Sequence, residues 1–330
     1  MSRVPKVSFI VICHQHAAHV GQCLRSIEAQ DWPESEVIVL DNGSTDGSGE
    51  VIRDWASRSS LSPRLLLETK RRTVCENLNH VMPMATSDYV ACISADDFFY
   101  PEKTKRQVAA LEQRGPSYVV AYADATRVHP DGSPYPGDES SFIRWHRSDL
   151  STLPDGDVLH ELIRAPFIPA MTTLIRREAL VAMGSFDESL VFEDYDAWLR
   201  LATGGKFHAD PAPLSAYRIL PDSMIRTVAS QEMPEKLLSD ARIMAKVNLI
   251  PRLEEKVRQN VRRRVLRLAI RLLSHPGRWG SRLHDLDQLA DIPALRLLAE
   301  AHETRGVLTE AEGNALLADA ISAGLISPTA

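Results

Sequence analysis

Three groups of polar side chains are candidates for chemistry because each places a carboxylate where a ligand could reach it. They are Asp41-Asn42, Asp96-Asp97 and Glu193-Asp194. Adjacent carboxylates repel each other unless a positive charge lies between them, and a divalent cation that prefers oxygen ligands supplies one. The Asp96-Asp97 pair therefore predicts a Mg²⁺ or Mn²⁺ site. The alternative is that this pair caps the helix predicted to begin at Pro101.

The first group opens the turn-forming segment Asp41–Ser48, Asp-Asn-Gly-Ser-Thr-Asp-Gly-Ser. A carboxylate at a strand end can accept a hydrogen bond from a nucleobase or a ribose hydroxyl. Gly43 and Gly47 permit positive φ and a close approach of a ligand to the backbone. An Asx turn with a helix N-cap has the same composition, so both interpretations stay open.

The third group, Glu193-Asp194, lies where a helix is predicted to begin. Acids at that position interact favourably with the helix dipole, but a carboxylate that points into a cleft could instead serve as a general base. Asp194 and Trp198 are four residues apart and so share one helix face. This spacing suggests an acid beside an aromatic platform for a sugar.

The elements that would position these side chains alternate along the first ~125 residues. Strands are expected at 7–13, 36–41, 65–68, 89–94 and 118–123, and helices at 20–30, 50–58, 75–84 and 101–111. Such alternation predicts an α/β fold with a mostly parallel sheet and helices on both faces. Ligands bind at the carboxyl ends of such strands, which is where Asp41-Asn42 and Asp96-Asp97 fall.

The remaining chain has a different pattern. Residues 127–154 are polar and rich in Pro, Gly, Asp and Ser, so we expect a long loop or a small irregular insertion there. Further strands are predicted at 172–175 and 214–219 and further helices at 177–183 and 194–202. Helical spacing dominates from about residue 231, which predicts an α/β domain over 1–228 and an all-helical C-terminal extension over 229–330.

Composition narrows the class of protein. The 330 residues are 44% hydrophobic and 25% charged with a net charge of −6, as in an ordinary globular protein. The negative charge and the lack of an aromatic-basic stripe argue against a nucleic-acid partner. The four cysteines show no metal-binding spacing, which favours free thiols. No run approaches the ~18 apolar residues of a membrane span, and the short run at 7–13 lacks a cleavage site, so we expect a cytoplasmic location.

The helical extension contains a strongly basic segment at 252–273. Its apolar residues recur at helical spacing, and its basic residues are Arg252, Lys256, Arg258, Arg262, Arg263, Arg264, Arg267 and Arg271. A basic amphipathic helix can lie on an anionic membrane, which would place the protein at the inner face of the membrane. Packing against the rest of the chain, or a homodimer contact, explains the pattern equally well.

Taken together, the order of these segments resembles the family 2 glycosyltransferases, which have the GT-A fold. The resemblance covers roughly residues 5–225. The segments that carry it are the first strand at 7–15, the nucleotide-binding turn Leu40–Ser48, the DXD-like Ile93–Phe98 with Pro101, the acceptor half at 174–187 and 193–201, and Tyr217-Arg218. It implies an inverting enzyme that moves a sugar from a nucleotide-diphosphate donor to a hydroxyl of a glycan or lipid-linked acceptor, in bacterial-type polysaccharide or glycoconjugate assembly.

The resemblance also implies roles for single residues. Asp41 and Asn42 would contact the nucleoside, Asp96 the ribose or diphosphate, and Asp97 the Mn²⁺ or Mg²⁺ ion. Asp194 would be the catalytic base, and Arg72 or its neighbour Arg71 would reach the diphosphate.

Some positions depart from the family pattern. Ser94 stands where the family often has Asp, Asn42 where many members have a second Asp, and the histidine often found after Tyr217-Arg218 is absent. Two other functions predict different sequence features. A sugar-nucleotide nucleotidyltransferase would carry a Gly-rich basic phosphate loop, which His14–His19 does not provide. A catalytically inert nucleotide-sugar-binding module would lack the Glu193-Asp194 pair, which is present.

Overall fold

The computed structural model describes residues 3–221, 233–277, 279–290 and 292–323. The chain divides into two compact units, residues 1–188 with 193–221 and residues 189–192 with 222–330. The boundary predicted at residue 228 lies outside the described residues, so the expected division into 1–228 and 229–330 stays a prediction.

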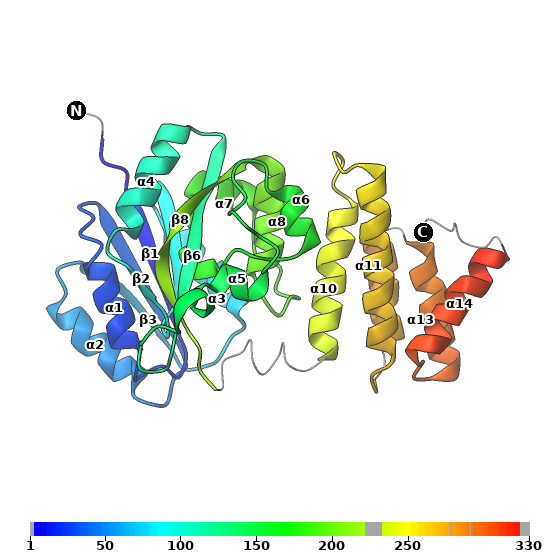
Figure 1. Cartoon of the computed structure of the whole chain (residues 1–330). Helices are drawn as coiled ribbons and strands as arrows, with labels where there is room; N and C mark the ends of the chain where they lie inside the picture. Colours follow the sequence, from blue (N-terminus) through cyan, green and yellow to red (C-terminus); the bar gives the residue numbers. More distant parts are fainter. Residues whose placement is uncertain (1–2, 222–232, 278, 291, 324–330) are drawn as a thin grey trace. The chain divides into compact units, whose positions relative to one another are not determined.

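A mixed sheet forms the centre of the first unit (Figure 1). Its strands within the described residues are β1 (Val7–Cys13), β2 (Ser35–Asn42), β3 (Arg64–Glu68), β4 (Tyr89–Ser94), β5 (Phe98–Phe99), β6 (Tyr118–Val128), β7 (Leu174–Arg176) and β8 (Lys206–Arg218), in the order β3-β2-β1-β4-β7-β6-β8-β5. β1 runs parallel to β2 and β4, β2 to β3 and β6 to β8, while β7 is antiparallel to β4 and β6, and β5 to β8. The predicted mostly parallel sheet with helices on both faces is confirmed.

Some helices begin at a clear capping signal in the sequence. α3 is an example, because the Thr73 side chain accepts a bond from the Glu76 N–H while the Glu76 carboxylate accepts one from the Thr73 N–H. The helices of this unit are α1 (Val20–Glu28), α2 (Ser48–Arg58), α3 (Val74–Val81), α4 (Lys103–Arg114), α5 (Phe142–His146), α6 (Leu159–Arg164), α7 (Arg177–Met183) and α8 (Asp194–Gly204). α1 and α2 pack against each other, and α4 packs on β6, β7 and β8 (Figure 1).

The register of the parallel strands brings the first two polar groups to one edge of the sheet. Cys13 of β1 pairs with Asp41 of β2, and Ile12 of β1 pairs with Ser94 of β4. Asp41-Asn42 and Asp96-Asp97 therefore flank the carboxyl end of β1. The strand order reverses between β1 and β4, and ligands of open α/β sheets bind at such a switch point.

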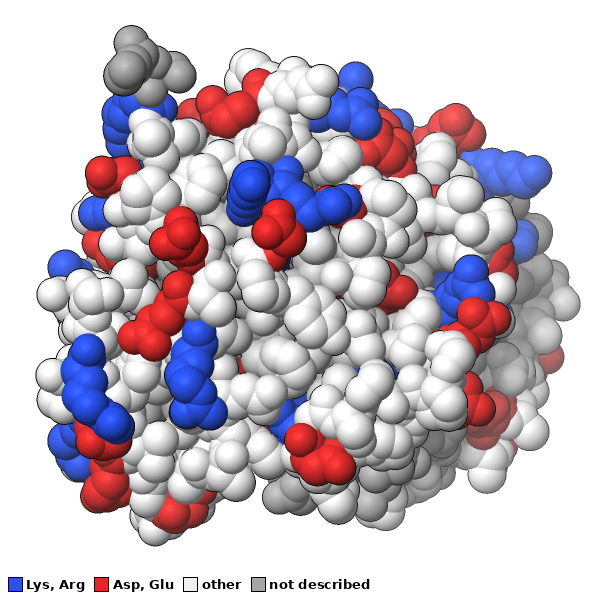
Figure 2. Space-filling view, turned by 60° about the vertical axis from the view of Figure 1, so that its left-hand side comes forward, with Lys and Arg blue, Asp and Glu red and all other residues white. Residues whose placement is uncertain are grey.

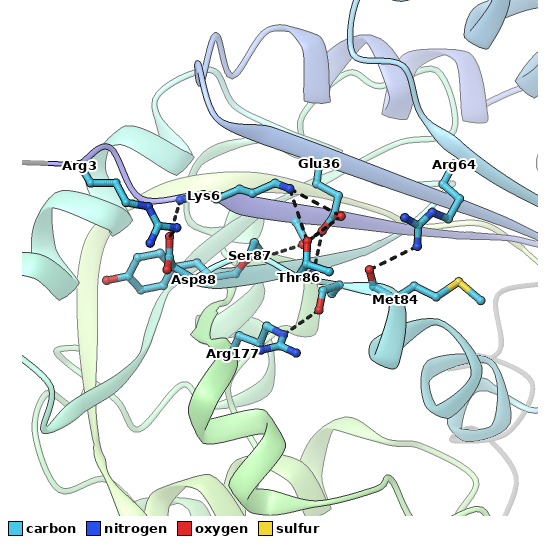
Figure 3. Close-up of polar contacts among 12 residues, drawn as sticks. Arg3, Lys6, Glu36, Arg64, Met84, Thr86, Ser87, Asp88 and Arg177 are labelled. Atoms are coloured by element: carbon cyan, nitrogen blue, oxygen red, sulfur yellow. Dashed lines mark hydrogen bonds and ion pairs between the residues drawn. The ribbon is translucent and has the colours of Figure 1, made fainter.

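The opposite ends of the same strands are joined by a polar network (Figure 3). Glu36 accepts hydrogen bonds from Ser8 Oγ at 2.5 Å and from the Thr86 N–H and hydroxyl at 3.0 and 3.1 Å. Asp88 accepts a bond from the Lys6 N–H at 2.7 Å. Burial raises the pKa of Glu36, but these hydrogen bonds and the Lys6 ammonium outweigh burial and lower the pKa below its ordinary value. The network fastens β1, β2 and β4 together at the end away from the candidate site.

Of the two alternatives for segment 127–154, the structure shows the small irregular insertion: β6 continues to Val128, and the turn Gly137–Ser140 and the short helix α5 follow. Asp124 holds α5 by accepting bonds from the Ser141 hydroxyl and, at 2.9 Å, from the Ile143 N–H. The final strand begins at Lys206 rather than at 214, since residues 206–210 pair with β6.

The second unit is helical throughout its described residues, so the predicted helical extension is confirmed. Its helices are α10 (Pro234–Asn248), α11 (Glu255–Leu273), α12 (Gly280–Ala290), α13 (Pro293–Arg305) and α14 (Glu310–Ser322), and α11 packs along α10 (Figure 1). Within the described ranges, every helix is too short or too polar to cross a bilayer.

The basic helix α11 buries the apolar side of its amphipathic pattern. Val261, Val265 and Leu272 are at most 2% exposed. The apolar side of α11 therefore cannot insert into a membrane in this fold. An electrostatic contact with a membrane through the exposed Lys256, Arg263 and Arg267 stays a prediction. A homodimer contact through this helix also stays a prediction. On the face drawn in Figure 2, cationic and anionic side chains are interspersed rather than gathered by sign.

Candidate active site

The turn after β2 is held tightly against the loop after β1. Asp41 is 4% exposed, and its Oδ1 accepts a bond from Ser44 Oγ at 2.5 Å. Gln15 N donates to the same Ser44 hydroxyl at 2.9 Å, and Ala17 N donates to Asp46 Oδ2 at 2.9 Å. Asp41 thus shapes the turn, as the Asx-turn interpretation expects, and its contact with a nucleoside stays a prediction.

Asn42 fixes the backbone of Arg72. Its Nδ2 donates to the Arg72 carbonyl at 2.9 Å, and its Oδ1 accepts from the Arg72 N–H at 2.8 Å. The Arg72 guanidinium lies 3.0 Å from Glu68 Oε1. The amide of Asn42 is therefore engaged in positioning this loop, and an Asp here would lose the donor to the carbonyl. A diphosphate contact by Arg72 stays a prediction, and it requires that Arg72 exchange Glu68 for the phosphate.

Asp96 and Asp97 differ in their surroundings. Asp97 is 2% exposed, and its Oδ1 accepts the Arg218 N–H at 2.8 Å. Burial, together with the charge of Asp96, raises the pKa of Asp97 well above its ordinary value. Asp96 is less buried; its Oδ1 accepts a bond from Ser94 Oγ at 2.5 Å and lies 3.7 Å from His16 Nε2. The helix-cap alternative is wrong for this pair, because the N-cap of α4 is Glu102.

Arg218 holds this edge of the sheet together. In the sequence it stands out only as part of the Tyr217-Arg218 motif. Its guanidinium is almost fully buried, and it donates to the Asp96 carbonyl at 2.7 Å, the Pro130 carbonyl at 2.7 Å and Gln22 Oε1 at 2.6 Å. A buried arginine cannot be distinguished from a surface one by residue type. His16 was also missed, although a histidine in the loop after the first strand is a usable signal.

A divalent cation fits the acidic pair. Among the described residues, no three His, Cys, Asp or Glu side chains gather to form a metal cage. Mg²⁺ and Mn²⁺ need no such cage, since magnesium usually takes one or two carboxylates and completes its shell with water and phosphate. Burial is the main cause of the raised pKa of Asp97, and the charge of Asp96 adds to it; a cation beside the pair would offset both effects. Asp96 is the more accessible of the two, and Asp97 as a ligand stays a prediction.

The third group lies at the start of α8, as predicted. Helix α8 begins at Asp194, whose Oδ1 accepts the Tyr195 N–H at 2.6 Å, and Glu193 precedes it as the N-cap. Burial and then the charge of Asp194 raise the pKa of Glu193 to about 8. Near neutral pH the raised pKa therefore keeps Glu193 largely protonated.

The expected aromatic platform at Trp198 is wrong. Trp198 is 5% exposed, and its indole N–H donates to the Ile168 carbonyl at 3.2 Å. Trp198 therefore belongs to the buried side of α8, and its four-residue spacing from Asp194 does not indicate a sugar contact.

Tyr217 links the acidic groups. Burial raises its pKa, and the charges of Asp97, Asp96 and Asp194 raise it further, in that order. The strand-end pair and the start of α8 therefore both influence the phenol of Tyr217.

The pKa of Glu193 predicts how stability depends on pH. An unfolded Glu titrates near pKa 4.3, so protonated Glu193 stabilises the fold fully below about pH 4.3, and this contribution is lost as the pH rises towards 8. We expect Glu193→Gln, which stays neutral, to melt about 2 to 4 °C above the wild type at pH 8.5, equivalent to about 1 kcal/mol. Thermal unfolding between pH 5 and 9 measures this. Glu178→Gln, exposed on α7, is the control, and wild-type and Glu193→Gln curves that stay parallel would refute the assignment.

Solved structures share this architecture. Residues 1–349 of TarS from S. aureus, in complex with UDP-GlcNAc, match 97% of this chain and 92% of that chain with a TM-score of 0.63 and 16% identity. The mannosyltransferase PcManGT from Pyrobaculum calidifontis, in complex with GDP-Man and Mn²⁺, matches 99% of this chain and 83% of that chain with a TM-score of 0.59 and 19% identity. The fold is the GT-A fold.

Sequence comparison then gives the family. The model of glycosyl transferase family 2 matches residues 8–182, and the chain belongs to this family. AmsE of Erwinia amylovora, an amylovoran biosynthesis glycosyltransferase, is 25% identical over 222 residues, which are 66% of this chain and 73% of AmsE. EpsE of Bacillus subtilis is 31% identical over 120 residues, 36% of this chain and 43% of EpsE, so the chain spans less than half of that relative. The protein is a glycosyltransferase.

Proposed function

We propose that this enzyme transfers a sugar, with inversion at the anomeric carbon, from a nucleotide-diphosphate sugar to a hydroxyl group of a glycan acceptor in polysaccharide or glycoconjugate assembly. The strand register supports the proposal, because it brings Asp41-Asn42 and Asp96-Asp97 to either side of the carboxyl end of β1. A transferase of this kind needs a donor site and a base that face one reacting carbon. AmsE, named for amylovoran biosynthesis, supports the assignment to polysaccharide assembly.

The donor side is built on the strand ends. Asp41 and the turn behind it offer a carboxylate and glycine backbone to a nucleoside, and Asn42 positions the loop that carries Arg72 for the diphosphate. We assign the divalent cation to Asp96 rather than to Asp97, the ligand that the family resemblance implies, because Asp96 is the more accessible of the two, is supported by Ser94 and lies close to His16. When bound, that cation stabilises the negative charge that grows on the departing diphosphate.

The acceptor side depends on Asp194. Its carboxylate takes the proton of the acceptor hydroxyl while the oxygen attacks the anomeric carbon, and the bond from that carbon to the diphosphate oxygen breaks with its electron pair. Attack from the face opposite the leaving group inverts the configuration. Glu193 stays protonated near neutral pH, so Asp194 acts without a second charge beside it.

A donor panel tests the proposal. We expect UDP-, GDP- or dTDP-sugars to raise Tm by several degrees only with Mn²⁺ or Mg²⁺ present, since a ligand at 100 times its Kd adds about 2.7 kcal/mol. Thermal unfolding with metal or with EDTA measures it, and inorganic phosphate is the control ligand. Failure of every nucleotide sugar to shift Tm would contradict the proposal.

A further inference from the structure

A cluster of aromatic rings extends from Tyr217 to the surface of the first unit. The Phe142 ring meets Tyr217 edge-on at 4.9 Å between centroids and Trp145 edge-on at 6.0 Å. Trp145 packs against His146 at 4.6 Å. The cluster therefore begins at the phenol that senses Asp194 and ends, two ring contacts away, at Trp145.

Trp145 is a large aromatic side chain that is 46% exposed. An indole combines a large apolar face with a polar N–H group, so a ligand that covers it gains hydrophobic stabilisation. Phe142, between Trp145 and Tyr217, is 8% exposed, whereas His146, packed against Phe142 and Trp145, keeps part of its surface exposed. The exposed surface therefore lies at the end of the cluster formed by Trp145 and His146.

Arg127 holds Trp145 in place. Its guanidinium carbon lies 4.1 Å from the Trp145 ring centroid and 4.6 Å from that of Tyr135. Its NH1 donates to the Glu139 carbonyl at 2.9 Å, and among the described residues it forms no ion pair with a carboxylate. The guanidinium is thus committed to the two rings, which fixes the indole before any ligand arrives.

The backbone under the platform is also fixed. Ser141 caps α5 by accepting the Arg144 N–H at 3.0 Å, and Asp124 accepts the Ile143 N–H at 2.9 Å. Burial and the charge of Arg127 lower the pKa of His146, so its imidazole stays neutral and can donate and accept hydrogen bonds near neutral pH. A preformed indole surface beside neutral polar groups suits a sugar ring, which presents apolar C–H faces and hydroxyl edges.

We propose that Trp145, backed by Arg127, is the platform on which a sugar ring of the acceptor stacks, so that the acceptor is an oligosaccharide whose reactive end extends past Tyr217 to Asp194. This inference rests on the proposed function and deepens it. Because the platform lies two ring contacts from Tyr217, a monosaccharide cannot occupy both ends. The residues at 127–146 would then select acceptors by length.

Fluorine NMR of the full chain labelled with fluorotryptophan tests the platform. The chain has 5 tryptophans, and the Trp145 signal is assigned by its loss in Trp145→Phe. The probes are glucose, mannose and N-acetylglucosamine and their oligosaccharides of two to six residues, titrated with a nucleoside diphosphate and Mn²⁺ present. We expect the Trp145 signal to shift with at least one oligosaccharide and not with its monosaccharide. A panel in which no oligosaccharide moves this signal overturns the proposal.

Kinetics with the saccharide identified in this way give a second readout. Trp145→Ala should raise the acceptor KM about tenfold or more and leave donor affinity unchanged, while Trp145→Phe retains most of the affinity. Trp32→Phe is the matched control, because that indole donates to the Pro5 carbonyl at 2.8 Å, near the opposite strand ends. An unchanged acceptor KM in Trp145→Ala overturns the platform, whereas failure of the wild type to bind any nucleotide sugar overturns the proposed function instead.

Discussion

Replacing Asp194 with Asn should lower kcat by about 10² to 10⁴-fold, the range expected when a general base is lost. The amide cannot take the hydroxyl proton, but it is nearly isosteric and its Oδ1 can still accept the Tyr195 N–H, which lies 2.6 Å away in the wild type. The start of α8 should therefore stay folded. Donor affinity should change by less than about threefold, because the lost interaction matters only in the transition state.

Release of the nucleoside diphosphate, followed by phosphorus NMR, measures kcat, and calorimetry measures donor affinity. Asp196→Asn is the matched control: it lies on the same helix, but its carboxylate pairs with Arg200 at 2.8 Å. That variant should lose stability and keep its activity at a temperature well below its Tm. Full activity in Asp194→Asn would remove Asp194 from the mechanism.

Replacing Asp96 with Asn should weaken metal-dependent donor binding by at least about 100-fold, or about 2.7 kcal/mol. The variant keeps an oxygen that Ser94 Oγ can reach, so the local fold survives while the negative charge is lost. Calorimetric titration of a nucleotide sugar with Mn²⁺ measures the loss. Without metal, the wild type and the variant should bind equally weakly.

Asp97→Asn is the informative comparison. An Asn oxygen can still accept the Arg218 N–H, so this variant separates the anchor role of Asp97 from a role as metal ligand. We expect a smaller loss than in Asp96→Asn, because Asp97 is 2% exposed. Undiminished Mn²⁺-dependent binding in Asp96→Asn would show that the strand-end pair does not hold the cation.

The strands that position the site could be predicted from the sequence, and there is a physical reason for this. β1, β2 and β4 are runs of apolar and β-branched residues that are buried on both faces, and such runs identify parallel strands without knowledge of their neighbours. Once the strands are known, topology brings their carboxyl ends together, and the residues that follow each end become candidates. Asp41 and Asp96 were found in this way.

The details that depend on tertiary partners were not predictable. Nothing in the sequence tells that the Asn42 amide will meet the Arg72 backbone, or that Trp198 will face the core rather than the cleft. The polar composition of 127–154 predicts an irregular segment but not that its α5 packs on β6, with Asp124 accepting the Ile143 N–H. Long-range contacts override composition in each case.

The most direct test of the central claim is a phosphorus NMR spectrum of the wild-type enzyme with Mg²⁺, a nucleotide sugar that raises its Tm, an oligosaccharide that shifts the Trp145 signal, and pyrophosphate. We predict that the two diphosphate resonances of the donor are replaced by those of a nucleoside diphosphate, and that proton NMR of the product shows the sugar on the acceptor in inverted configuration. Formation of a nucleoside triphosphate and a sugar phosphate would identify a nucleotidyltransferase instead and contradict the account.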